Sequence, residues 1–142
     1  MTSEQEASHG KVTGPEATAP LTSLPPPYQL ARGYYISRAL LLVANLAIAD
    51  LLKDGPRDYG DLAKSTGTHP PSLNRVMRLL ASVGVFAEQE NGNFALTSLG
   101  RCLRTGVPGS SRAMVMHFAG LRIQDSWRDL EDCVRTASQH LV

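Results

Sequence analysis

Histidines and cysteines are the side chains of this 142-residue sequence best suited to metal binding or nucleophilic chemistry. The histidines are His9, His69, His117 and His140. None of them has the spacing of a His-x-His or His-Glu-x-x-His site, and the two cysteines, Cys102 and Cys133, form no Cys-x-x-Cys pair. We therefore expect neither a metal centre nor a disulfide framework. Two reduced thiols favour a cytoplasmic protein.

His117 has the most informative surroundings of the four. It lies in the apolar segment Met114–Ala119, of the kind that packs in a core, at an interface or along a hydrophobic pocket. A core or interface histidine is the simplest interpretation. His69 precedes Pro70 at a predicted helix start, where we expect a capping or surface role, and the two terminal histidines should be solvated. No Ser-His-Asp or Cys-His arrangement is indicated.

Length, charge and hydropathy limit the classes of protein that the chain can belong to. A chain of 142 residues is about one domain, and its net charge of +1 argues against nonspecific binding of polyanions. The longest apolar run, residues 39–49, is broken by Asn45 and is shorter than the roughly 20 residues of a membrane span. The acidic, proline-rich start does not resemble a signal peptide. No membrane association is expected.

The composition changes abruptly after residue 27. Residues 1–27 contain five of the nine prolines, which predicts a disordered tail. From Tyr28 to Leu46 the sequence predicts a helix with apolar side chains around its whole axis. Leaving two such side chains in water would forfeit about 3 to 6 kcal/mol, so we expect this helix to be either fully internal or buried between its own domain and a partner. The candidate interface residues are Tyr34, Tyr35, Leu41 and Leu42.

The middle of the chain shows the signals of two short helices and a hairpin. Asp58 is a good N-cap for a helix over residues 59–65 that Gly67 closes, and an amphipathic stripe predicts a second helix over residues 70–83. Asn91-Gly92, between the strand-like runs 85–89 and 94–97, predicts a β-hairpin. Two helices and a hairpin are the parts of a winged helix-turn-helix. The fold class is mainly α, with one short hairpin.

Further helices flank these parts. A short helix is expected over residues 47–53 before them. After them we expect a helix that Thr97 caps and that runs to Arg104, one from Ser110 toward Leu121, and a last one from Ile123 to about Ala137. Residues 28–142 then form one domain.

A winged helix invites a DNA-binding hypothesis, with Arg75 and Arg78 on the reading helix. Between Asp58 and Thr97 there are three basic and four acidic residues, which gives a net charge of −1. A DNA-binding module neutralises several phosphates, so this charge argues against nucleic acid as a partner. A winged-helix transcriptional regulator remains the alternative function.

The order of these signals resembles a known module. "YYISRALLLVANLAIADLL", then "DYGDLAKSTGTHPPSLNRVMRLLASVGVFAEQENGNFALTSLGRCLR", then "SWRDLEDCVRT" is similar to the N-terminal dimerisation domain of S-adenosylmethionine-dependent O-methyltransferases that act on small molecules, above all bacterial secondary metabolites. The resemblance covers residues 28–136 and is most specific over residues 70–100. It implies a homodimer, a winged helix that does not read DNA, and one wall of an acceptor pocket.

The resemblance also implies residue roles and partners. Met114, His117, Phe118 and Trp127 would form part of the wall for a small aromatic acceptor in an intact enzyme. S-adenosylmethionine and the catalytic base would belong to a separate Rossmann-like domain, and that domain is absent from this sequence. No two glycines are separated by a single residue, so we expect no cofactor site and no catalytic residue in this chain. Its partner is then a second copy or a methyltransferase catalytic subunit, and it is inactive alone.

Overall fold

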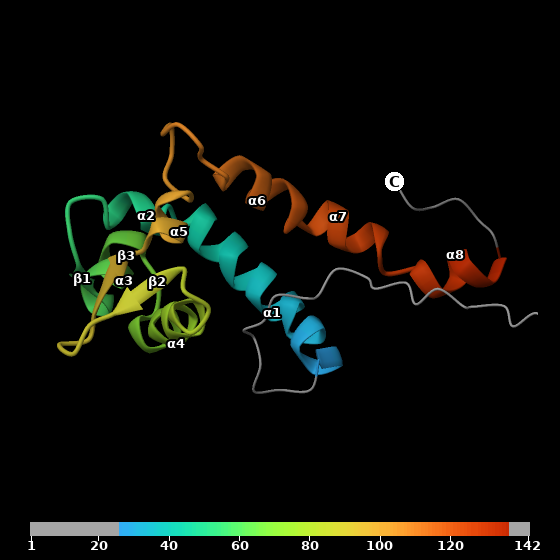
Figure 1. Ribbon diagram of the computed structural model, residues 1–142, viewed down its shortest axis with the longest axis horizontal. Coiled ribbons are helices and arrows are strands. Elements are labelled where there is room, and N and C mark those ends of the chain that lie inside the picture. The colour runs from blue at the N-terminus through green and yellow to red at the C-terminus, as the bar shows by residue number, and fades with distance from the viewer. Residues whose placement is uncertain (1–25, 137–142) are drawn as a thin grey trace, which may run out of the picture. The chain divides into compact units, whose positions relative to one another are not determined.

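The computed structural model of the chain describes residues 26–136 (Figure 1). Contacts divide the chain after Ala31, and the fold described below is that of the unit that begins at Arg32. Helix α1, Pro26–Asn45, begins two residues before the predicted start, because prolines are tolerated in the first turn of a helix. The rest of the predicted tail, residues 1–25, lies outside the described residues, as do His9 and His140.

A sharp bend joins α1 to the short helix α2, Ile48–Leu51. The bend is at Ala47, whose φ of 51° and ψ of 37° lie in the left-handed region that residues with a Cβ seldom adopt. Ile48 and Ala49 follow it and are buried. The bend therefore carries backbone strain that the buried residues beside it hold in place.

Helices α3, Tyr59–Thr66, and α4, Pro70–Ala81, form the helix-turn-helix that the sequence predicts. The Asp58 carboxylate accepts a hydrogen bond from the Gly60 N–H at 2.7 Å, and Gly67 ends α3 in the left-handed conformation. Both predicted ends of α3 are confirmed to within one residue. Along α4 the side chains that face the core are Leu73, Met77 and Leu80.

The sheet has one strand more than expected. β2, Phe86–Glu88, and β3, Asn93–Leu96, form the predicted hairpin, with Ala87 opposite Ala95. β1, Arg57–Asp58, adds a third antiparallel strand, in the order β1-β3-β2, by pairing Arg57 with Phe94. The expectation of a hairpin alone is wrong, because the segment before α3 reaches the free edge of β3.

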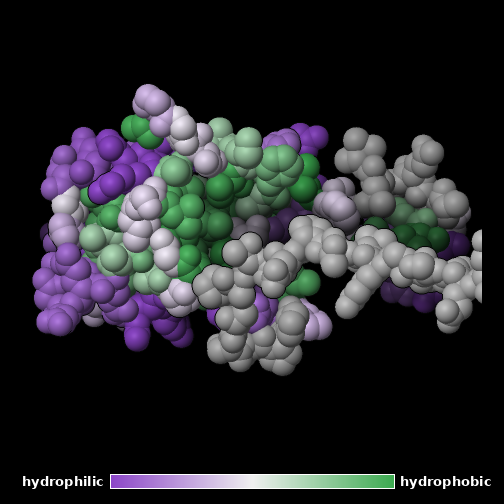
Figure 2. All heavy atoms as spheres, viewed as in Figure 1, coloured by the Kyte–Doolittle hydropathy of each residue, from purple (hydrophilic) through white to green (hydrophobic). Residues whose placement is uncertain are grey.

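The core lies between this sheet, α3, α4 and the C-terminal part of α1. Its largest fully buried side chains are Phe86, Phe94, Ile48, Leu52, Leu62, Met77, Leu80 and Val43. Helix α5, Ser98–Arg101, follows β3 and ends before the predicted Arg104. Figure 2 shows hydrophilic residues around the sheet and α3, and hydrophobic residues gathered over α1 and α6.

Three short helices complete the described chain: α6, Arg112–Phe118, α7, Leu121–Ser126, and α8, Leu130–Thr136. The boundaries predicted for this region, 110–121 and 123–137, are wrong. Gly120 separates α6 from α7 in an extended conformation, where a Cβ would lie 2.8 Å from the Met116 carbonyl oxygen. Within residues 26–136 no helix is both long and apolar enough to cross a membrane.

Candidate functional site

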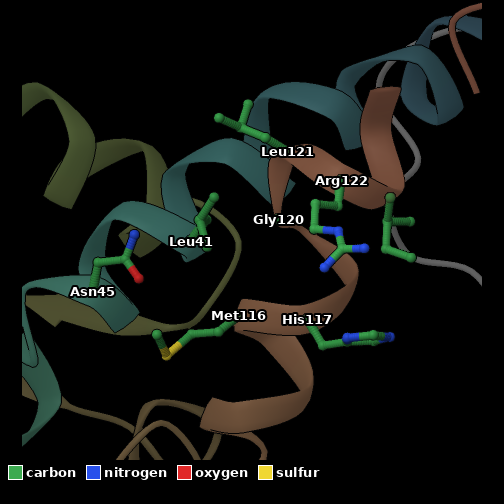
Figure 3. Close-up of a pocket in the computed structure, with 8 residues that line it drawn as sticks. Leu41, Asn45, Met116, His117, Gly120, Leu121 and Arg122 are labelled. Carbon is green, nitrogen blue, oxygen red and sulfur yellow. The ribbon is translucent and has the colours of Figure 1, made fainter. Parts of the chain in front are cut away.

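A groove of about 700 Å³ runs between α1 on one side and α6 and α7 on the other (Figure 3). We call it the groove. Its lining is mostly apolar, with an amide, an imidazole and a guanidinium group. The lining residues are Leu41, Asn45, Met116, His117, Gly120, Leu121, Arg122 and Ile123.

The helix positions explain why these side chains meet. Leu41 and Asn45 lie four residues apart, on one face of α1. Met116 and His117 lie in the last turn of α6, and the break at Gly120 directs the first turn of α7 along the same side. Figure 3 shows Leu41 and Asn45 across from Met116 and His117. The break at Gly120 is therefore what gives the groove its second wall.

Of the four predicted acceptor-wall residues, the structure brings one to the groove. His117 lines it and is exposed, so it is not a core histidine. Its ring contacts Phe118 edge to face, with centroids 5.1 Å apart. Met114, Phe118 and Trp127 are exposed and lie outside the groove in the described part of the chain. Sequence reasoning missed Met116, although it belongs to the same apolar segment.

Aromatic and aliphatic side chains cover the outer surface of α1. Tyr34 and Tyr35 are 60% and 65% exposed, with their rings 5.8 Å apart in an edge contact, and Leu42 is 39% exposed. Leu41 is half-buried because it lines the groove. The predicted interface residues therefore form two sets, three exposed on the helix surface and one inside the groove.

Polar contacts connect the walls of the groove. The Arg112 Nε donates to the Ala44 carbonyl oxygen at 2.8 Å, which joins α6 to α1. The Arg38 guanidinium donates to Gln124 Oε1 at 3.3 Å, which joins α1 to α7.

A carboxylate lies close to the first of these contacts. Asp50 accepts from the Thr105 N–H at 2.9 Å and from the Thr105 hydroxyl at 2.6 Å. Burial alone would raise the pKa of Asp50, but these hydrogen bonds and the charges of Arg112 and Arg104 outweigh it and hold the pKa below its ordinary 3.8. Asp50 is therefore an ionised group at neutral pH that fixes the loop before α6.

The remaining candidates for chemistry do not form a site. Within residues 26–136 no three His, Cys, Asp or Glu side chains come together as a metal site would require. Cys102 is half-buried and Cys133 is buried, and both are unpaired thiols. His69 is exposed at the N-cap position of α4, with Nδ1 3.0 Å from the Ser72 hydroxyl. These observations agree with a surface role for His69.

The predicted DNA-reading arginines make contacts within the winged helix. The Arg78 Nε donates to the Glu88 carboxylate on β2 at 3.2 Å, and the Arg75 guanidinium donates to the Ser72 hydroxyl at 3.3 Å. The wing thus places a carboxylate against the helix that would have to enter a DNA groove. This arrangement opposes phosphate binding.

Comparisons with known proteins agree with the fold. The family model of the O-methyltransferase dimerisation domain matches residues 28–106. The phenazine O-methyltransferase PhzM of Lysobacter antibioticus is 41% identical over 109 residues, which are 76% of this chain and 31% of that protein. The 8-amino-8-demethylriboflavin N,N-dimethyltransferase of Streptomyces davaonensis is 38% identical over 77% of this chain and 31% of that protein.

The structural comparison gives the same result. The crystal structure of LaPhzM superimposes with a TM-score of 0.76 at 37% identity, over 87% of this chain and 36% of that one. The chain spans about a third of the length of the curated relatives it matches. These relatives are methyltransferases, and they give no support to the transcriptional regulator.

Proposed function

Because the chain belongs to the O-methyltransferase dimerisation domain family, we propose that it joins two copies of a small-molecule methyltransferase into a homodimer through α1. The observation that carries the proposal is the exposure of Tyr34, Tyr35 and Leu42 on α1. Fully burying one large apolar side chain stabilises a protein by about 1.5 to 3 kcal/mol. A partner that covers three half-exposed side chains would add several kcal/mol to the stability of the assembly.

The groove is our candidate for the acceptor wall of the intact enzyme. Phenazine and riboflavin, in the names of two relatives, are flat aromatic systems. Met116 and Leu121 offer adaptable apolar contacts to such a ring, and His117 offers a polar group beside them. We therefore propose a small planar aromatic acceptor. The roles of Met114, Phe118 and Trp127 stay predictions, and these exposed side chains would need further protein to enclose a ligand.

We propose that S-adenosylmethionine is bound by a different part of the enzyme. A nucleotide-like cofactor binds where a parallel strand turns through glycines into a helix. All three strands of the described sheet are antiparallel, and the glycines of the sequence lack the required close spacing. The described residues do not fit the cofactor. The partner of this domain would be a methyltransferase catalytic part, and a cytoplasmic location stays a prediction from its two unpaired thiols.

Light scattering during gel filtration tests the proposed dimer at micromolar concentration. We expect twice the 15.3 kDa mass for the unchanged chain and the monomer mass for Leu42→Asp, since a carboxylate at the interface would lose its water. Leu99→Asp is the matched control, because Leu99 is 54% exposed and lies on α5. It should remain a dimer. A monomeric unchanged chain, or equal dissociation of both variants, would contradict the proposal.

A further inference from the structure

Two arginine contacts lie at opposite ends of the groove. Arg38 and Leu41 are three residues apart on α1, so they share the face that meets α7. The Arg38 contact with Gln124 lies at this end. At the other end, Arg112 reaches the Ala44 carbonyl oxygen, one residue before Asn45 in the groove lining.

At the Arg112 end of the groove, contacts of Asp50 add to the hydrogen bond of Arg112. Asp50 on α2 accepts both Thr105 hydrogen bonds, and its charge acts on Arg112. The strained residue Ala47 lies between Ala44 and Asp50 in the chain. A left-handed alanine persists only where its surroundings fix it, so this corner of the structure is held firmly.

Apolar packing alone would not fix the width of the groove. Ala119 is buried and Val115 packs on the core, but such contacts have little directional preference. Helices as short as α6 and α7, with seven and six residues, are not stable alone. Hydrogen bonds depend on distance and angle, so they can set a separation that packing leaves loose.

We propose that Arg38 and Arg112 are positioning residues that hold α7 and α6 at a fixed separation from α1, and so set the shape of the groove. The inference rests on the proposed function only in taking the groove to receive the acceptor. The positions of α6 and α7 relative to α1 do not depend on that function. Neither arginine is assigned to contact the acceptor, since each acts through the helix that it fastens.

Hydrogen exchange of the full 142-residue chain tests the proposal. In the double variant Arg38→Met and Arg112→Met, which keeps most of the side-chain volume, we expect amides of α6 and α7 to exchange about tenfold faster. Amides of α4 should change less than about twofold, since α4 makes no use of these contacts. Arg112→Lys keeps a cationic donor near the Ala44 carbonyl oxygen and should restore most of the protection lost in Arg112→Met.

Arg128→Met is the matched control, because Arg128 pairs with Asp125 within its own segment at 2.7 Å. It should leave the exchange of α6 unchanged. Unchanged exchange in the double variant, or equal acceleration in α4 and α6, would overturn the proposal. If the double variant does not fold, the single Arg38→Met variant decides by the exchange of α7 compared with that of α4, since Arg38 contacts Gln124 on α7. Because Arg38 lies on α1, light scattering of each variant shows whether its mass has changed, and this keeps failure here distinct from failure of the proposed function.

Discussion

The Thr97 hydroxyl donates to the Val85 carbonyl oxygen at 2.7 Å and so fastens the start of α5 to the residue before β2. The Thr97 hydroxyl oxygen in turn accepts a hydrogen bond from the Gly100 N–H at 3.0 Å. Gly100 is buried, and a Cβ there would overlap the Val85 carbonyl oxygen. The close approach of two backbone segments therefore requires glycine at this position.

We predict that Gly100→Ala lowers the free energy of unfolding by about 3 kcal/mol, because backbone atoms must move to admit the methyl group. Urea denaturation followed by circular dichroism measures it. Gly33→Ala is the matched control, since Gly33 lies in α1 with open space around it. That change should stabilise the chain by about 0.5 to 1 kcal/mol, as expected for a helical glycine. A loss below 1 kcal/mol for Gly100→Ala would contradict the prediction.

Asp58 should contribute measurably to stability as the N-cap of α3. Asp58→Ala leaves the Gly60 N–H without its acceptor, and we expect a loss of about 1 kcal/mol in the same measurement. Asp58→Ser should retain most of the stability, since serine is also a good N-cap. Asp54→Ala, an exposed carboxylate in the turn after α2, controls for the loss of charge. Equal losses at both positions would show that capping is not the cause.

The elements that the sequence predicts well have their determinants close together in the chain. The Asp58 cap, the stripe along α4 and the Asn91-Gly92 turn each act within a few residues, and the structure confirms all three. The strand β1 went unpredicted because two residues carry no periodic pattern. Its pairing with Phe94 depends on a contact between distant parts of the chain.

The groove depends on tertiary structure in the same way. Met116, Leu121 and Arg122 lie side by side only because the chain bends at Gly120. The sequence predicts a break between Leu121 and Ile123 rather than at Gly120, since a single glycine in a helical pattern is often tolerated. The apolar segment around His117 could be recognised from the sequence, but the sequence did not show which of its side chains are buried and which are exposed. Which of its side chains face α1 follows from the position of α6.

The lowered pKa of Asp50 predicts a dependence of stability on pH. Because the pKa is lower in the folded state, the carboxylate stabilises the fold above about pH 4, and this contribution is lost as the pH falls through the folded-state pKa. We expect the difference in melting temperature between the unchanged chain and Asp50→Asn to shrink as the pH is lowered through and below the ordinary pKa of 3.8. Other carboxylates titrate in both proteins, so the difference isolates Asp50. A difference independent of pH would contradict the assignment.

Finally, we predict that the chain does not bind duplex DNA specifically at near-physiological salt. Glu88 pairs with Arg78, and the winged unit from Asp58 to Thr97 carries a net charge of −1. Gel-shift assays should therefore give no discrete complex. Replacing Glu88 and Glu90 by Gln raises this charge to +1, and we expect at most weak binding that rising salt abolishes, since it would come from phosphate contacts alone. A discrete complex with the unchanged chain, lost when Arg75 and Arg78 are changed to Ala, would contradict the prediction, because it would mean that α4 reads bases despite the carboxylate beside it.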